Sequence, residues 1–250
     1  MKTNTDDWND HWGKQNELAE YNPGQILRHR LVFNEIEKIK KEVSVLVDFG
    51  SGQGDLIKRL SPKFNQIKMI GLENSEIGIE ISKLNNPVAT FYLADLTQNL
   101  PAEISLIKPD LITCCEVMEH VDKPELLVEN AHSMLKLNGY LIVTLPGGPM
   151  TKLDFHIGHR KHYDKGTLTS LLRNGGFDRI SIICAGWPFF NLYRLMLLAR
   201  GDALVGDVSV RTSALKTAII KILGLTFACL FNLNFKNSPY GWQMIAIARK

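Results

Sequence analysis

The stretch from Val43 to Asp55, VSVLVDFGSGQGD, constrains the fold of this chain more than any other. Residues 43–47 are apolar except for one serine, which predicts a buried strand ending in the acid Asp48. A turn follows, and it contains Gly50, Ser51, Gly52 and Gly54. The apolar spacing over 56–60 then predicts a helix. A strand, a glycine turn and a helix in this order let the backbone approach a ligand closely, so we expect a nucleoside-bearing cofactor here.

Segments typical of strands and helices alternate along the rest of the chain. We expect strands at 66–72, 88–93, 109–115, 140–145, 179–185 and 241–249, and helices at 25–41, 75–84, 124–137 and 165–174. This alternation predicts an α/β domain with a parallel sheet and helices on both faces. Ligands bind beyond the carboxyl ends of the strands in such sheets. Four predicted strands lead to an acid at that edge, namely Asp48, Glu73, Asp95 and Glu116.

Taken in order, these motifs resemble the class I S-adenosylmethionine-dependent methyltransferases over residues 43–185 and the last strand. VDFGSGQGD is similar to the first motif of that family, PDLITCCEVMEHV to its fourth, and LKLNGYLIVTLPGG to the strand that follows. The subgroup most similar in appearance includes the ubiquinone-pathway O-methyltransferases and the sugar and natural-product methyltransferases. The resemblance implies a Rossmann-like sheet of seven strands with helices on both faces.

The resemblance also implies which residues hold S-adenosylmethionine. Glu73 lies about 20 residues beyond the glycine turn, the spacing at which an acid of a nucleotide-binding unit meets a ribose. A carboxylate can accept hydrogen bonds from both hydroxyls of the ribose. Asp95 would contact the adenine amino group, with Leu96 beside the ring. The full predicted set is Asp48, Gly50, Ser51, Gly52, Gly54, Glu73, Asn74, Asp95, Leu96 and Glu116.

Two histidine clusters follow predicted strands at the same edge of the sheet. Methyl transfer from a sulfonium is an in-line displacement, so the enzyme mainly aligns the acceptor, and a base assists when the acceptor is a hydroxyl. The candidate catalytic residues are His120, the adjacent Glu119, and His159 from the loop 154–163. In the resembling families the stretch that corresponds to Gly158, His159 and Tyr163 lines the acceptor pocket.

A metal site is an alternative interpretation of the first cluster. Glu116, Glu119 and His120 are spaced i, i+3 and i+4, so they share one face of a helical turn. With a histidine from the second cluster, these groups could hold a divalent metal. This arrangement resembles the E-x-x-E-H motif of the small-RNA 3′-terminal 2′-O-methyltransferases. We predict a site without a metal, in which Glu119 caps a helix and His120 is a base or a packing residue.

An apolar insert, residues 186–239, separates the last two predicted strands. We therefore divide the chain into an N-terminal arm and helix (1–42), an S-adenosylmethionine-binding domain (43–185 plus 240–250) and this mainly helical insert. Charged residues interrupt its apolar stretches, so neither stretch is a good membrane span. We expect the insert to project over the acceptor side, as a lid, a dimer surface or an interfacial membrane anchor.

Charge and cysteine content bear on partners and location. Residues 1–150 hold 15 Lys and Arg against 21 Asp and Glu, whereas residues 151–250 hold 14 against 5. The C-terminal part is therefore either a solvated basic face or a surface for an anionic partner. The four cysteines lie in apolar runs without a Cys-x-x-Cys pair, which predicts reduced core residues. No signal peptide is visible, so we expect a cytoplasmic location, with peripheral membrane contact left open.

The leading hypothesis is a methyltransferase that acts on an oxygen of a small molecule, such as a quinone precursor, a glycan or a lipid-linked sugar. A metal-assisted RNA 2′-O-methyltransferase is an alternative, but the sequence shows no aromatic-rich basic RNA module, so we do not expect a nucleic-acid partner. A non-catalytic binding subunit of the same fold is a further alternative. A homodimer is left open.

Overall fold

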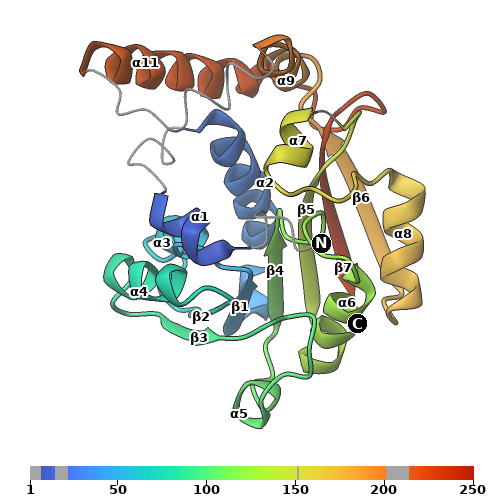
Figure 1. Ribbon diagram of the computed structural model, residues 1–250. Coiled ribbons are helices and arrows are strands. Elements are labelled where there is room, and N and C mark those ends of the chain that lie inside the picture. The colour runs from blue at the N-terminus through green and yellow to red at the C-terminus, as the bar shows by residue number, and fades with distance from the viewer. Residues whose placement is uncertain (1–6, 15–21, 151, 201–213) are drawn as a thin grey trace.

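The structure of the protein, a computed structural model, describes residues 7–14, 22–150, 152–200 and 214–250. Seven strands form one sheet in the order β3-β2-β1-β4-β5-β7-β6 (Figure 1). They are β1 (Val45–Phe49), β2 (Lys68–Glu73), β3 (Thr90–Leu93), β4 (Leu111–Cys115), β5 (Tyr140–Pro146), β6 (Arg179–Ala185) and β7 (Gln243–Arg249). The expected Rossmann-like α/β fold with a seven-stranded sheet is therefore confirmed.

Strand β7 departs from the all-parallel arrangement that the alternation predicts. Strands β1 to β5 pair in parallel, whereas β7 pairs antiparallel with both β5 and β6. Ala185 at the end of β6 lies opposite Gln243 at the start of β7, so the chain leaves and re-enters the sheet at one edge. A connection as long as 186–242 is compatible with either strand direction, which is why the alternation alone does not reveal the reversal.

The register of the parallel strands brings the predicted acids to one edge. Phe49 of β1 pairs with Leu72 of β2 and with Cys114 of β4. Glu73 at the end of β2 pairs with Leu93 at the end of β3. The carboxyl ends of these four strands therefore meet, and the four acids Asp48, Glu73, Asp95 and Glu116 lie at that edge or directly beyond it.

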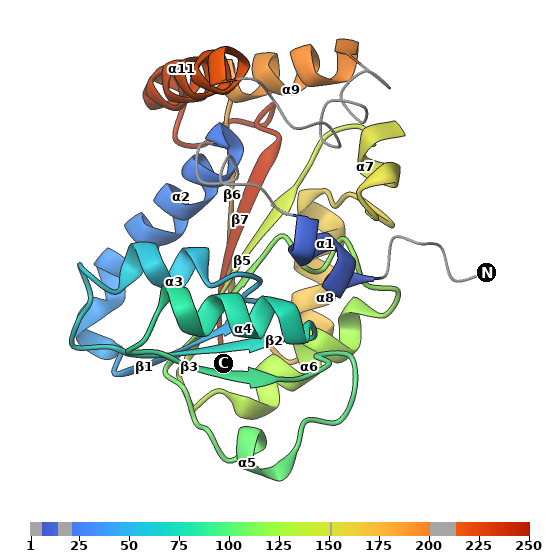
Figure 2. The ribbon, with the colours of Figure 1, turned by 60° about the vertical axis from the view of Figure 1, so that its left-hand side comes forward.

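Helices cover both faces of the sheet (Figures 1 and 2). Successive strand residues point to opposite faces, and Leu46 and Val47 accordingly belong to different hydrophobic clusters. The cluster around Leu46 packs against α2 (Pro23–Ile39), α3 (Asp55–Leu60) and α4 (Glu76–Asn85). The cluster around Val47 packs against α5 (Ala102–Ser105), α6 (Pro124–Met134) and α8 (Lys165–Asn174).

Capping residues explain where several helices begin. The Asn22 side chain accepts hydrogen bonds from two backbone amides of the first turn of α2, and Pro23 occupies the first helical position. Helix α2 therefore begins two residues before the predicted start at 25. The Asp164 side chain and Thr167 form a capping box at the start of α8, which spans the predicted residues 165–174.

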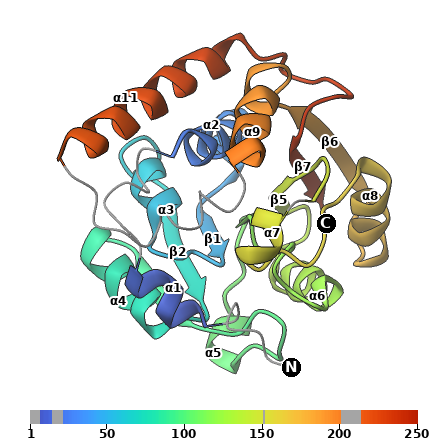
Figure 3. The ribbon, with the colours of Figure 1, turned by 45° about the horizontal axis from the view of Figure 1, so that its top comes forward.

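The insert packs mainly on α2 (Figures 1 and 3). It contains α9 (Phe189–Arg200), α11 (Ala214–Leu230) and the short η4 (Phe231–Leu233). Leu27 of α2, Phe190 of α9 and Phe231 of η4 form a separate hydrophobic cluster. Helix α11 thus lies along α2, while α9 approaches α7 (Lys152–His156), which precedes the second histidine cluster.

The structure also bears on two expectations: that all four cysteines are core residues, and that neither apolar stretch of the insert spans a membrane. Cys114 is buried and Cys115 and Cys184 are half-buried, but Cys229 is exposed on α11, so the prediction that all four are core residues is wrong for Cys229. Its apolar neighbours in the sequence suggested burial, but α11 packs with only one side. Among the described residues, no helix combines the length and apolar character needed to span a bilayer.

Candidate functional site

The glycine turn after β1 depends on backbone conformations that favour glycine. Gly50, Gly52 and Gly54 have φ values of 69°, 54° and 78°. A Cβ atom on Gly50 would lie 2.5 Å from Val117. The amides of Gly50 and Ser51 both donate to the carbonyl of Leu72, at 2.8 and 3.0 Å. The turn is therefore held tightly against the end of β2.

Glu73 at the end of β2 is connected to this turn. Its Oε2 accepts a hydrogen bond from the Gly52 amide at 2.9 Å, and its Oε1 accepts one from the Ser75 amide at 3.1 Å. Burial raises the pKa of Glu73, and these hydrogen bonds oppose that shift. The Asn74 backbone and the Trp12 side chain also act on Glu73 as hydrogen-bond donors and lower its pKa. Glu73 is therefore the main hydrogen-bond acceptor of this edge.

Asp48 lies below the turn and is almost completely buried. Its Oδ1 accepts a hydrogen bond from the Thr113 hydroxyl at 2.7 Å. Burial raises the pKa of Asp48 to about 7, the Thr113 hydrogen bond opposes the rise, and the charge of Glu73 adds to it. Asp48 therefore supports the floor of the site from inside the sheet.

The remaining residues predicted for the cofactor lie around this edge in different environments. Asp95 is half-buried, and its Oδ1 accepts hydrogen bonds from the amide and hydroxyl of Thr97. Leu96 is buried, and its carbonyl accepts a hydrogen bond from Asn130. Asn74 is exposed. The hydroxyl of Ser51 is buried, has no hydrogen-bond partner among the described residues, and lies beside Gly71 of β2, where an added Cβ would meet it at 2.6 Å.

Glu116 follows β4 in a strained conformation, with a φ of 56°. The Gln243 amide of β7 donates to its Oε1 at 3.0 Å and to the Leu145 carbonyl at 3.1 Å. The Arg28 guanidinium lies 3.7 Å from the other carboxylate oxygen. Glu116 is therefore tied to α2 and β7 and is not part of the group formed by Glu119 and the histidines, although its charge contributes to the raised pKa of Glu119.

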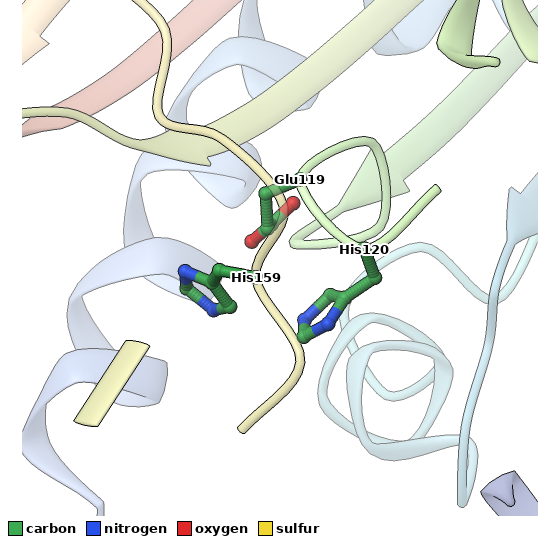
Figure 4. A group of neighbouring side chains, drawn as sticks. All are labelled: Glu119, His120 and His159. Atoms are coloured by element: carbon green, nitrogen blue, oxygen red, sulfur yellow. The ribbon is translucent and has the colours of Figure 1, made fainter. Parts of the chain in front are cut away.

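The two predicted histidine clusters meet in space (Figure 4). The rings of His120 and His159 are 4.7 Å apart between centroids and nearly perpendicular. One ligand atom from each of Glu119, His120 and His159 lies within 4.8 Å of the others. Glu119 is fully buried, and neither carboxylate oxygen has a hydrogen-bond partner among the described residues. The predicted catalytic residues therefore form one group, in which Glu119 does not cap a helix.

Burial sets the protonation of this group. It lowers the pKa of His120 to about 4. It lowers the pKa of His159 to about 3, with a further contribution from the nearby His120. It also raises the pKa of Glu119 well above its usual value. Both imidazoles are therefore neutral at neutral pH, and each keeps one ring nitrogen that can accept a hydrogen bond.

A second buried group, which the sequence analysis missed, joins the histidine loop to the insert. Arg194 of α9 pairs with both oxygens of the fully buried Asp154, at 3.0 and 3.2 Å. His159 Nδ1 lies 3.0 Å from His162 Nε2, and both rings lie near Asp154. The sequence could have indicated this pair, because Arg194 lies inside an apolar stretch and a buried charge requires a partner. Asp154, His159 and His162 also have the spacing of metal ligands.

Helix α1 (Trp8–Lys14) is the other part of the site that the sequence analysis missed. The Trp12 ring lies over Gly52, where an added Cβ would meet it at 2.7 Å. The Trp8 ring lies 5.1 Å from that of His120, edge to face. Asn9 accepts hydrogen bonds from the Ser75 hydroxyl and the Ile77 amide, which ties α1 to α4. Two tryptophans in a polar segment were the available signal, and they cover the glycine turn and the histidine group together.

The other predicted pocket residues surround the same loop. Gly158 has a φ of 89°, which allows the sharp bend before His159. Tyr163 is buried, and its hydroxyl donates to the Met118 carbonyl at 3.2 Å.

Two surface hollows elsewhere, near Tyr140 and Asp110, lie at the amino edge of the parallel strands. They are therefore remote from the acids and histidines.

The chain is similar to a known protein family and to several characterised relatives. A family model described as "Methyltransferase domain" matches residues 18–182. Trans-aconitate 2-methyltransferase of Variovorax paradoxus is 27% identical over 140 residues, which cover 56% of this chain and 50% of the relative. Ubiquinone biosynthesis O-methyltransferase of Paraburkholderia phytofirmans is 28% identical over 97 residues, 38% of this chain and 41% of the relative. The chain thus spans about half the length of the curated relatives it matches.

Solved structures show the same fold. A SAM-dependent methyltransferase from Archaeoglobus fulgidus aligns with a TM-score of 0.55 at 18% identity, covering 89% of this chain and 94% of that one. Phospholethanolamine N-methyltransferase 2 of Haemonchus contortus, solved with phosphomonomethylethanolamine and S-adenosylhomocysteine, aligns with a TM-score of 0.58 at 14% identity, covering 99% of this chain and 61% of that one. At these identities the likeness concerns the fold.

Proposed function

The chain belongs to the methyltransferase-domain family, and on that premise we propose that it transfers a methyl group from S-adenosylmethionine to an oxygen of a small-molecule acceptor. One observation carries the proposal: Glu73 and the glycine turn form a single hydrogen-bonded unit at the carboxyl edge of the sheet. A donor–acceptor site of this kind suits a ribose diol beside a backbone turn.

The residues at the edge fit this cofactor. In our proposal Glu73 accepts hydrogen bonds from the two ribose hydroxyls, and Ser51 belongs to the turn that contacts the cofactor. Gly50, Gly52 and Gly54 keep the turn free of Cβ atoms. We propose that Asp95, Leu96 and Asn74 contact the base of the cofactor, and that Asp48 and Glu116 support the edge. When bound, S-adenosylmethionine supplies a methyl group already activated by its sulfonium.

We propose that His120 and His159 act on the acceptor hydroxyl. Both are neutral at neutral pH, so a ring nitrogen can accept the hydrogen bond of the hydroxyl and take its proton as the new bond forms. Glu119 lies within reach of both rings, and an oxygen of its carboxyl group would accept a hydrogen bond from the ring that has taken the proton. The Trp8 ring beside His120 helps to exclude water.

The names of relatives support oxygen as the acceptor atom. They include a malonyl-[acyl-carrier protein] O-methyltransferase and a ubiquinone biosynthesis O-methyltransferase. We propose a quinone precursor, a glycan or a lipid-linked sugar as the class of acceptor. Substituting His120→Ala should lower turnover at least about tenfold and leave cofactor affinity nearly unchanged. Unchanged turnover would exclude His120 as a base.

Calorimetric titration with S-adenosylmethionine is the direct test of the proposal. We expect binding with one site per chain, and weaker binding to the Glu73→Ala variant. A folded wild-type chain that binds no S-adenosylmethionine would eliminate every enzymatic interpretation.

A metal-assisted 2′-O-methylation of RNA is the second candidate function. One observation favours it: the buried Glu119 carboxylate has no hydrogen-bond partner among the described residues and faces two histidines, as a metal ligand would. The ligands would be Glu119, His120 and His159, and not Glu116. Turnover after exhaustive treatment with a chelator decides between the two, because full activity in the absence of metal excludes this mechanism.

A further inference from the structure

The loop that carries His159 also contains a hydrogen-bonded chain of two imidazole rings. His162 Nδ1 lies 3.0 Å from the carbonyl oxygen of Gly148, which follows β5. The other ring nitrogen, His162 Nε2, lies 3.0 Å from His159 Nδ1. The side chains of His159 and His162 are only 6% and 5% exposed. The chain therefore connects a backbone carbonyl to His159 through one nearly buried ring.

The carbonyl at the head of the chain sets the direction of both hydrogen bonds. A carbonyl oxygen only accepts hydrogen bonds, so His162 Nδ1 carries the hydrogen of the bond to Gly148. A neutral imidazole has one such hydrogen, which makes His162 Nε2 an acceptor. His159 Nδ1 must then donate the second hydrogen bond. With its hydrogen on Nδ1, a neutral His159 has its lone pair on Nε2.

The ion pair beside the chain favours a neutral His162. The Asp154 carboxylate lies 3.8 Å from His159 Nδ1 and 3.8 Å from His162 Nε2. Arg194 already balances its charge, because the guanidinium contacts both carboxylate oxygens. A protonated His162 would add a second positive charge beside a single buried carboxylate. The reversed chain, in which His162 donates from both nitrogens, is therefore disfavoured.

The backbone places His159 between this chain and the other histidine group (Figure 4). The Arg160 amide donates to the Glu119 carbonyl at 2.7 Å, which holds the loop against the turn after β4. His159 is the member that the group with Asp154 and His162 shares with the group of Glu119 and His120. The two nitrogens of an imidazole point in diverging directions. Because Nδ1 is directed toward His162, Nε2 is left outside the chain.

We propose that His162 is a positioning residue, which holds His159 in the tautomer that offers the Nε2 lone pair to the acceptor hydroxyl. The tautomer follows from the hydrogen-bonded chain, whereas the use of Nε2 as a base rests on the proposed function. Free histidine in water favours the opposite tautomer, with its hydrogen on Nε2. The chain therefore changes which nitrogen of His159 is able to accept a proton.

The proposed step balances as follows around His159. The proton of the acceptor hydroxyl moves to Nε2, the hydroxyl oxygen forms a bond to the methyl carbon, and the bond between methyl and sulfur breaks with its electron pair remaining on sulfur. His159 then carries a hydrogen on each ring nitrogen. Its Nδ1 continues to donate to His162, so the chain stays intact while the charge is present.

Nuclear magnetic resonance of the full chain labelled with ¹⁵N-histidine tests the tautomer. Long-range ¹H–¹⁵N correlation distinguishes a ring nitrogen that carries a hydrogen from one that does not. The sample is kept at neutral pH without cofactor or acceptor, and the signals lost in His159→Gln assign His159. We expect the wild-type His159 to carry its hydrogen on Nδ1.

Two substitutions of His162 form a matched pair. Glutamine keeps an oxygen that can accept the hydrogen bond from His159 Nδ1, whereas leucine removes the acceptor. We expect His162→Gln to retain the Nδ1–H form of His159, and His162→Leu to make the Nε2–H form the major one. His156→Leu is the control, because His156 is exposed on α7, and it should leave the His159 signals unchanged.

Circular dichroism shows whether each variant is folded, and the wild-type spectrum decides even if the leucine variant is not. A wild-type His159 with its hydrogen on Nε2 would overturn the inference, as would the Nδ1–H form persisting in a folded His162→Leu variant. Calorimetry with S-adenosylmethionine on the same samples separates this inference from the proposed function. The Nδ1–H form in a chain that binds no cofactor would reject the use of Nε2 as a base, whereas the Nε2–H form in a chain that binds it would reject the positioning role alone.

Discussion

At the scale of single residues, Glu73 at the end of β2 joins this strand to the glycine turn that follows β1. Its two oxygens hold the Gly52 and Ser75 amides, so the position of the glycine turn depends on an intact carboxylate. A glutamine at this position has one acceptor oxygen and one amide group, and can keep only one of these hydrogen bonds. The chemistry of this residue therefore affects both the turn and the ligand.

We predict that Glu73→Gln weakens S-adenosylmethionine binding by about tenfold to a hundredfold, since about 1–3 kcal/mol is lost when a buried hydrogen bond is left unmade. Calorimetry measures the effect. Glu76→Gln is the control, because Glu76 is exposed on the first turn of α4. Equal affinity of the two variants would show that Glu73 does not bind the cofactor.

Asp48 makes stability depend on pH in a defined direction. Burial raises the pKa of Asp48 to about 7 in the folded state, from an ordinary value of 3.8. The folded state therefore binds more protons than the unfolded state between these values, and the free energy of unfolding falls as pH rises through that window. We predict that Asp48→Asn, which does not titrate, gains about 3 kcal/mol relative to the wild type between pH 4.5 and 7.5.

Urea denaturation of both proteins at several pH values measures this gain, and parallel curves would contradict the prediction. Asp110→Asn is the control. Burial alone would raise the pKa of Asp110, but hydrogen bonds from Lys136 and from the Ser44 and Val45 amides lower it overall. Asp110 stabilises the folded state above pH 3.8, and this contribution is lost only as pH falls below that value. The free energy of unfolding of Asp110→Asn should therefore differ from that of the wild type by a constant amount over the same range.

At the scale of elements, one ion pair fastens the insert to the rest of the molecule. Arg194 on α9 and Asp154 on α7 meet in a buried environment, and Arg194 contacts both carboxylate oxygens. The pair couples two helices that the chain separates by the whole of α8 and β6. It also orients the loop that carries His159 and His162.

We predict that Arg194→Met lowers the free energy of unfolding by about 3 kcal/mol, because it leaves a buried carboxylate without its guanidinium. Chemical denaturation measures the loss. Arg173→Met, at an exposed position of α8, should change stability by less than about 0.5 kcal/mol. If the Arg194 variant behaves like the Arg173 variant, the pair does not hold the insert in place.

At the scale of the whole molecule, the carboxyl edge of the sheet is covered by two elements from opposite ends of the chain. Helix α1 lies over the glycine turn and the histidine group, and α9 lies next to α7. Helix α11, in contrast, packs on α2 and makes none of the contacts described for the site. Ligand binding should therefore protect α1 from hydrogen exchange and leave the exchange of α11 unchanged.

Hydrogen exchange with and without S-adenosylmethionine tests this division. We predict that the cofactor increases the protection of residues 50–54 and of α1 (Trp8–Lys14), because a ligand stabilises the folded segments that contact it. Protection over 222–230 should not change. An increase confined to α11, or none in α1, would separate the tryptophan helix from the cofactor site.

Local chemistry determined much of this protein. The glycines of the turn, the apolar periods and the capping residues act within a few residues, so the strands, the helices and the edge with the four acids follow from the sequence. The tertiary structure alone decided the reversal of β7, the meeting of Glu119 with His159, the Arg194–Asp154 pair and the position of Trp12 over Gly52. Each joins segments far apart in the chain. Packing and charge burial select such contacts, and no local period encodes them.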